Sequence, residues 1–182
     1  MAAVLVFFIV ETSLLIFITE APILLQAEIF FIFIGISALG FVFHELAHKF
    51  TAQHYGLWSE FRLDPIGAMI SLLTALSPFK IVSPGAVVIF GSGVTKENMG
   101  VVALAGPLAN IIQTLVFTFL SQFFTRPHFW WLPLAAALNA DLAIFNLIPI
   151  SVLDGRKVFV WNKKAWVLLF TTALILWIIQ HF

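Results

Sequence analysis

The chain has 182 residues, of which 62% are hydrophobic and 10% are charged, and its formal net charge is zero. A soluble domain of this length cannot bury that much apolar surface, so the composition predicts a protein that crosses a membrane several times. The zero net charge gives no reason to expect nucleic acid as a partner, and the absence of cysteine excludes disulfides, thiol catalysis and thiolate metal sites.

Five stretches have the composition of membrane-spanning helices, which need about 20 mostly apolar residues. They cover residues 3–19, 29–50, 101–124, 129–150 and 165–180. No Lys or Arg precedes the first stretch and no small-residue cleavage site follows it, so it is interpreted as a spanning helix rather than a signal peptide. We therefore expect an all-α membrane bundle of five or six helices, forming a single domain over residues 1–182.

The segment between the second and third long stretches has a different character. It carries charged residues and two shorter apolar runs, GAMISLLTALSPF at 67–79 and GAVVIFG at 85–91. The first run is compatible with a short sixth helix or a re-entrant segment. The second is rich in β-branched residues and bracketed by glycines, which favours a strand. We expect a short re-entrant or β-hairpin insertion here.

The positions of the basic residues predict an orientation. If the first stretch runs outward, Arg126 is the only basic residue outside, and the other eight of the nine lie on the opposite side. The positive-inside rule assigns that side to the cytoplasm. The end of the second long stretch, with the sequence HELAH, then lies at the cytoplasmic side.

The stretch FVFHELAHKF, at 41–50, contains a pattern of metal ligands. On a helix His44 and His48 differ by about 40° around the axis, so both can bind one ion. Glu45 is placed to reach a water on that ion as a general base, which is the zinc-hydrolase pattern H-E-x-x-H. Ionisable groups at membrane depth are costly and usually functional.

A catalytic zinc needs a third protein ligand, and two residues are candidates. His54 has the spacing of soluble metzincins, but Thr51 stands where that pattern requires a glycine. Asp154 follows the fourth long stretch at the same predicted depth as HELAH. Pro149 and Gly155 flank it, which favours a broken helix there. A simple Asp-Gly turn is the alternative, and the matching depth favours Asp154 as the ligand.

Together these motifs resemble those of the site-2 protease family of intramembrane zinc metalloproteases. The likeness rests on HELAH, on NLIPISVLDG at 146–155 and on GPLAN at 106–110, and it covers about residues 29–160. It implies one catalytic zinc held by His44, His48 and Asp154, with Glu45 catalytic. It also implies a substrate that is itself a single transmembrane helix, unwound for cleavage within the lipid bilayer of a prokaryotic cell membrane. The chain has no room for a PDZ or CBS domain, and its oligomeric state is left open.

Further residues have two interpretations each. Asn146 is a candidate catalytic donor to the developing oxyanion and Asn110 a candidate substrate contact, although asparagine also bridges packed membrane helices. The strand-like run can offer an edge to an extended substrate or form a buried hairpin, and its predicted substrate-binding residues are Val87, Val88 and Ile89.

Asp141 can either orient a zinc-bound histidine or pair within the bundle. Two other functions compete with proteolysis, namely zinc transport or binding without hydrolysis, and an inactive scaffold for single-span partners. A transport path usually places ligands along the bilayer, and Glu45 would have no purpose in either alternative.

Overall fold

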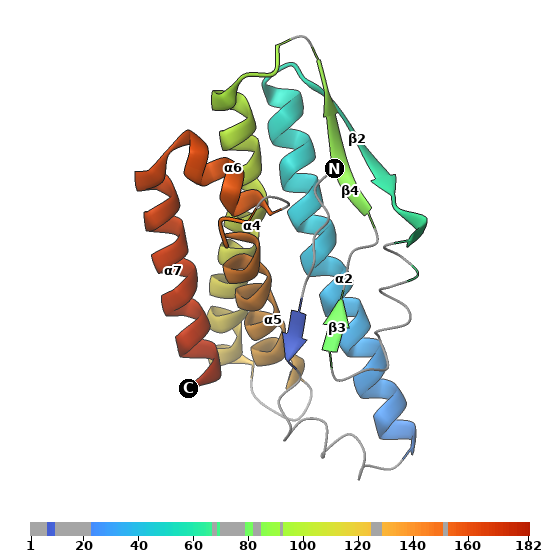
Figure 1. The fold of residues 1–182 in the computed structure, drawn as a ribbon. Helices are drawn as coiled ribbons and strands as arrows, with labels where there is room; N and C mark the ends of the chain where they lie inside the picture. The colour runs from blue at the N-terminus through green and yellow to red at the C-terminus, as the bar shows by residue number, and fades with distance from the viewer. Residues whose placement is uncertain are drawn as a thin grey trace.

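The structure is a computed structural model, and it describes residues 7–9, 23–66, 69, 79–81, 85–91, 93–124, 129–150 and 153–182. In this part of the chain, helices dominate and the strands form two short antiparallel pairs (Figure 1). The elements in chain order are β1 (Phe7–Ile9), α2 (Ile23–His54), β2 (Trp58–Leu63), β3 (Phe79–Ile81), β4 (Gly85–Phe90), α4 (Lys96–Phe123), α5 (Trp131–Asn146), α6 (Asp154–Trp161) and α7 (Lys163–His181).

Three of the described helices contain stretches long and apolar enough to cross a membrane. These stretches are Phe31–His54 in α2, Lys96–Phe123 in α4 and Lys163–His181 in α7. They confirm long apolar helices where spans are predicted at 29–50, 101–124 and 165–180. Large apolar side chains remain exposed on these helices, among them Phe31, Phe119 and Leu168. Such a surface is unfavourable in water and fits contact with lipid.

The fourth predicted span, 129–150, is shorter in the structure. Helix α5 has 16 residues and ends at Asn146, where the N–H of Leu147 bonds back to the carbonyl of Ala143. Pro149 gives the physical reason, since a proline disfavours helical geometry in the residue before it. A bundle of five or six full spans is therefore not seen in the described residues.

The first predicted helix, 3–19, is wrong where the structure describes it. Phe7–Ile9 forms strand β1, which pairs antiparallel with β3 so that Phe7 lies opposite Ile81. Aromatic and β-branched residues favour a strand, and in this short segment that preference prevails. The rest of 3–19 and most of the predicted segment 67–79 lie outside the described residues.

The strand predicted in GAVVIFG is confirmed as β4. It pairs antiparallel with β2 over six residues, with Trp58 opposite Phe90 and Leu63 opposite Gly85. One face of this hairpin packs on α2, because Ile89 lies against the buried cluster of Ala52, Leu57 and Val102. The hairpin therefore lies beside the end of α2 that carries HELAH (Figure 1).

Helix α4 contacts all four other described helices, and its most extensive contacts are with α5, α2 and α6. It begins with a capping box, in which Thr95 and Asn98 exchange side-chain and backbone hydrogen bonds. A buried apolar cluster that includes Ile36 and Phe41 of α2 and Leu138 and Leu142 of α5 joins those two helices. Helix α7 packs on α5 from the other side (Figure 1).

Helix α6 is held against α4 and α7 by aromatic residues. The ring of Trp161 lies so close to Gly100 that a Cβ there would be 2.2 Å from it. The indole N–H of Trp166 donates to the carbonyl of Leu147 at 2.8 Å. These contacts fix the connection from α5 to α6, which carries Asp154.

Candidate metal centre

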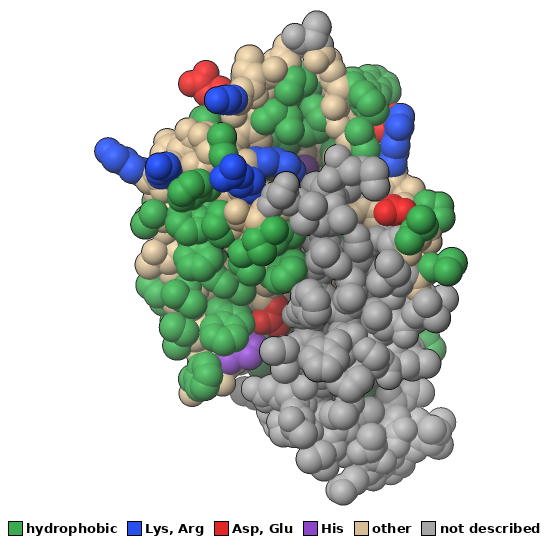
Figure 2. Space-filling model, in the orientation of Figure 1, with side chains coloured by type: hydrophobic (Ala, Val, Ile, Leu, Met, Phe, Trp, Pro, Cys, Tyr) green, Lys and Arg blue, Asp and Glu red, His purple; other side chains and the backbone are tan. Residues whose placement is uncertain are grey.

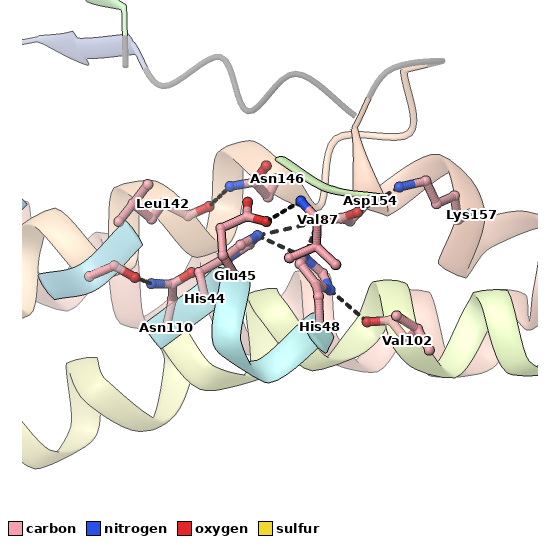
Figure 3. Close-up of polar contacts among 11 residues, drawn as sticks. His44, Glu45, His48, Val87, Val102, Asn110, Leu142, Asn146, Asp154 and Lys157 are labelled. Carbon is pink, nitrogen blue, oxygen red and sulfur yellow. Dashed lines mark hydrogen bonds and ion pairs between the residues drawn. The ribbon is translucent and has the colours of Figure 1, made fainter. Parts of the chain in front are cut away.

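His44, His48 and Asp154 form one buried group of potential metal ligands (Figure 3). Nε2 of His48 lies 3.0 Å from Nε2 of His44 and 2.9 Å from Oδ2 of Asp154. Nε2 of His44 lies 3.3 Å from the same carboxylate oxygen. The i, i+4 spacing thus puts both histidines on one face of α2, and the tertiary fold brings the aspartate to them.

Asp154 reaches this position because the chain turns sharply between α5 and α6. A Cβ on Gly155 would lie 2.1 Å from the carbonyl oxygen of Leu147, so only glycine allows this approach. Asp154 is the first residue of α6, and the predicted helix break lies just before it. Lys157 binds its other carboxylate oxygen, Oδ1, at 2.9 Å, which leaves Oδ2 to face the histidines.

The charge state of Asp154 suits a metal ligand. Burial alone raises the pKa of its carboxyl, but the neighbouring His48 and Lys157 outweigh burial and hold that pKa well below the usual range. The carboxylate is therefore ionised, as a metal ligand must be.

Hydrogen bonds behind the two histidines set which ring nitrogen faces the group. Nδ1 of His48 donates to the carbonyl of Val102 at 2.7 Å. Nδ1 of His44 lies 2.6 Å from the amide oxygen of Asn110. Both Nδ1 atoms thus act as donors, and both Nε2 atoms are directed at the carboxylate. This is the usual outer arrangement around metal-bound histidine.

These donors fit a divalent metal. Two Nε2 lone pairs and a carboxylate oxygen converge, and such a group is stable only around a positive charge, which a proton or a metal ion supplies. Tetrahedral zinc with bonds of about 2.0–2.1 Å would separate its ligand atoms by about 3.3 Å. The three observed separations are 2.9–3.3 Å. Two histidines and one carboxylate also leave the fourth position of a catalytic zinc open.

Gly106 of α4 forms one wall of this centre. A Cβ at this position would lie 2.4 Å from Nε2 of His48 and 2.6 Å from Nε2 of His44. Any side chain here would therefore clash with the two Nε2 atoms of the candidate ligand group. Gly106, the glycine of the GPLAN motif, therefore lies directly against the two histidines of the ligand group.

Glu45 is also buried, with 5% of its surface exposed, and it does not point into the ligand group. Its Oε2 accepts a hydrogen bond from the backbone N–H of Val87 at 2.9 Å. Figure 3 shows its carboxylate between Val87 and Asn146. A carboxylate beside a metal centre, but not bound in it, can act as a base toward a metal-bound water.

Known proteins with related sequences carry a matching description. A protein of Methanocaldococcus jannaschii named "Putative zinc metalloprotease MJ0611" is 39% identical over 130 residues, which cover 70% of this chain and 68% of that protein. The chain belongs to this family of zinc metalloproteases.

Two further relatives of the family are longer than the part matched here. "Zinc metalloprotease MJ0392" of the same organism is 30% identical over 131 residues, 68% of this chain and 32% of that protein. "Putative zinc metalloprotease Rip2" of Mycolicibacterium smegmatis is 28% identical over 128 residues, 62% of this chain and 49% of that protein. No protein-family model and no solved structure matches the chain.

The two asparagines predicted at the site, Asn146 and Asn110, have different surroundings. Asn146 is 1% exposed, its Nδ2 donates to the carbonyl of Leu142, and its Oδ1 has no partner among the described residues. Asn110 is fully buried behind His44 and bonds to it. Its position points to orienting a ligand, whereas the predicted contact with substrate remains untested.

Asp141 and His54 lie away from the ligand group. Oδ1 of Asp141 accepts from the indole N–H of Trp177 at 2.8 Å and lies 3.5 Å from His181 on α7. This favours the alternative in which Asp141 pairs within the bundle. His54 is exposed at the end of α2 and packs on Tyr55.

Asn139 is a buried polar residue that the sequence motifs do not include. This residue of α5 is 1% exposed, and its Oδ1 accepts a hydrogen bond from Asn110 at 2.9 Å. The sequence did indicate that Asn139 has a polar partner, since an asparagine inside an apolar helix needs one. Its seven-residue spacing from Asn146 also places both amides on the same face of α5.

Proposed function

We propose that this protein is an intramembrane zinc metalloprotease of the site-2 protease type. In this proposal it hydrolyses peptide bonds within or near the transmembrane segments of other membrane proteins. One observation carries the proposal, namely a buried His-His-Asp group with a neighbouring glutamate near the end of α2. The same helix contains a stretch apolar enough to cross the membrane. A hydrolytic centre at that position is suited to a substrate that lies in the bilayer.

The residues divide the chemistry between them. His44, His48 and Asp154 would hold the zinc ion, which when bound would supply an activated water and a Lewis acid for the scissile carbonyl. Glu45 would accept a proton from the attacking water and return it to the leaving amine. Asn146 is the candidate donor to the oxyanion, through the N–H of its amide that is not bonded to Leu142.

Among the described residues β4 pairs only with β2, and we assign its other edge to an unwound substrate. In an antiparallel pair alternate residues direct their N–H groups at the partner strand. The N–H of Val87 faces Glu45, so Val87 lies on the edge turned away from β2, whereas the N–H of Val88 is turned toward β2. An extended substrate that adds to this edge would lie beside Glu45.

Replacing Val87 with proline is expected to slow cleavage about tenfold, because the N–H of Val87, which donates to Glu45 at 2.9 Å and lies on the edge assigned to the substrate, is lost together with a hydrogen bond of about 1.4 kcal/mol. Proline is tolerated at a strand edge, so the hairpin should persist. The matched control is Val87→Ala, which keeps the N–H and shortens the side chain. Cleavage rates and zinc content of both variants are compared with wild type, and equal rates for both would contradict docking at this edge.

The distribution of charge supports a cytoplasmic site. Described Lys and Arg residues gather on one face around the turn from α6 to α7 (Figure 2). They include Arg156, Lys157, Lys163 and Lys164. Asp154 lies at the same end of the molecule, on α6. The positive-inside rule then places the metal centre toward the cytoplasm.

The proposal predicts zinc-dependent cleavage. The purified full chain is placed in vesicles with a single-span substrate, and its zinc is removed with a chelator. We expect cleavage to stop, because no water is activated without the metal. Added zinc should restore cleavage, and added magnesium should not, because the two-histidine site suits zinc rather than a hard oxygen-seeking cation.

Two results would contradict the proposal. Cleavage that continues in zinc-free protein would show that another protease is responsible. Absence of cleavage by zinc-loaded protein, with several single-span substrates, would favour a transporter or an inactive scaffold. Zinc flux in the same vesicles and binding of a single-span partner would separate those two functions.

A further inference from the structure

Two buried asparagines connect three helices behind His44. Nδ2 of Asn110 on α4 donates to Oδ1 of Asn139 on α5 at 2.9 Å, and to the carbonyl of Gly40 on α2 at 3.2 Å. Oδ1 of Asn110 lies 2.6 Å from Nδ1 of His44. At most 1% of either asparagine is exposed, so water does not compete for these contacts.

The hydrogen bonds run from His44 through Asn110 and Asn139 to the backbone of Ala135. The group at the Ala135 end determines which atom donates in each of them. Nδ2 of Asn139 donates to the backbone carbonyl of Ala135 at 2.9 Å, and a carbonyl can only accept. Oδ1 of Asn139 must then face Asn110 as an acceptor. Asn110 in turn must present its NH₂ group to Asn139 at 2.9 Å and to the Gly40 carbonyl, which also can only accept, at the longer distance of 3.2 Å, and its oxygen to His44.

This order determines the protonated nitrogen of His44. Because the amide oxygen of Asn110 can only accept, Nδ1 of His44 must carry a proton. In the neutral ring Nε2 then bears the lone pair, and Nε2 is the atom that faces His48 and Asp154. If the Asn110 amide were turned over, the neutral ring would carry its proton on Nε2, where it would block a metal.

Close approach of the helices makes the arrangement possible. A Cβ on Gly40 would lie 3.1 Å from Oδ1 of Asn139 and 3.1 Å from Cδ1 of Leu142. The glycine therefore lets α2 come near α5, with its carbonyl in reach of Asn110.

We propose that Asn139 is a positioning residue of the metal centre, which fixes the Asn110 amide and thereby the metal-binding nitrogen of His44. The inference rests on the zinc-dependent function proposed above. Asn139 itself touches neither the ligand atoms nor the space beside them. The competing explanation is that it only joins α4 to α5, as asparagine does in many membrane bundles.

Zinc affinity of the full chain in detergent, measured by competition with a chelator, separates the two explanations. Asn139→Leu removes the acceptor and should weaken zinc binding about 10- to 100-fold, the usual effect of losing an outer partner. Asn139→Asp is the rescue variant. Its buried carboxyl takes a proton, donates to Ala135 and accepts from Asn110, so its zinc affinity should stay close to wild type.

The matched control is Thr114→Val. Thr114 is fully buried and donates to the carbonyls of Asn110 and Ala136, so it joins the same two helices without touching the Asn110 side chain. Loss of the Thr114 hydroxyl should leave the zinc affinity near the wild-type value. Nitrogen NMR of histidine-labelled protein should also show the protonated Nδ1 of His44 in wild type and in Asn139→Asp, and a larger share of the Nε2-protonated ring in Asn139→Leu, where only the 3.2 Å bond to Gly40 still orients the Asn110 amide.

The outcomes distinguish this inference from the proposed function. Wild-type affinity in Asn139→Leu would overturn the positioning role while leaving the zinc protease intact. Equal losses in Asn139→Leu and Thr114→Val would overturn it too, in favour of simple helix association. Failure of the wild-type chain itself to bind zinc would overturn the proposed function. If Asn139→Leu does not fold, Asn139→Ala, which adds no bulk, replaces it.

Discussion

Replacing Glu45 with glutamine is expected to slow cleavage of a single-span substrate by about 10²- to 10⁴-fold, the range usually supplied by a general base. Glutamine has the same shape but cannot take a proton from water. Its amide oxygen can still accept the hydrogen bond from Val87 that the carboxylate accepts at 2.9 Å. The zinc content should remain unchanged, because Glu45 is not in the ligand group.

The control for this substitution is Glu97→Gln. Glu97 is exposed in the first turn of α4, so the same chemical change there should leave cleavage at the wild-type rate. Cleavage and bound zinc are measured on the same preparations. Full activity of Glu45→Gln with zinc bound would rule out Glu45 as the base and would direct attention to another proton acceptor.

Replacing Gly106 with alanine is expected to abolish zinc binding and cleavage together. The added methyl would lie 2.4 Å and 2.6 Å from the Nε2 atoms of His48 and His44, well inside van der Waals contact. Both histidines are also fixed from behind by Val102 and Asn110, so they cannot move away cheaply. We expect zinc affinity to fall at least about 100-fold, as for the loss of several kcal/mol.

Gly35→Ala is the matched control for this effect. Gly35 also lies in a spanning helix, but a Cβ there meets nothing within 4 Å. Alanine at that position should leave zinc binding unchanged and favour the helix slightly. Normal zinc affinity in Gly106→Ala would mean that the metal lies elsewhere, and the proposed centre would have to be revised.

Local spacing is what made the metal centre predictable. His44 and His48 are four residues apart on one helix, so their convergence follows from helical geometry alone. Asp154 could be matched to them only by its expected depth in the membrane, and the structure places it in hydrogen-bond range of His48. The contacts of Asn139 with Asn110 and of Val87 with Glu45 could not be predicted, because each depends on the packing of elements far apart in the sequence.

For the fold, too, the elements determined by nearby residues were predictable, whereas those determined by distant residues were not. Long apolar helices such as α2 and α4 were predictable, since composition over many residues determines them. The end of α5 depends on one proline, and β1 depends on pairing with a strand more than 60 residues away. Short elements whose partners are distant in sequence carry little signal of their own.

The metal ligands also come from distant parts of the chain, since His48 and Asp154 are separated by 106 positions. A ribosome adds about 5–20 residues per second, so the aspartate emerges roughly 5–20 s after the histidines. Throughout that interval the growing chain has two ligands and no complete centre. The three-residue group therefore cannot form until the helix carrying Asp154 has been made and packed.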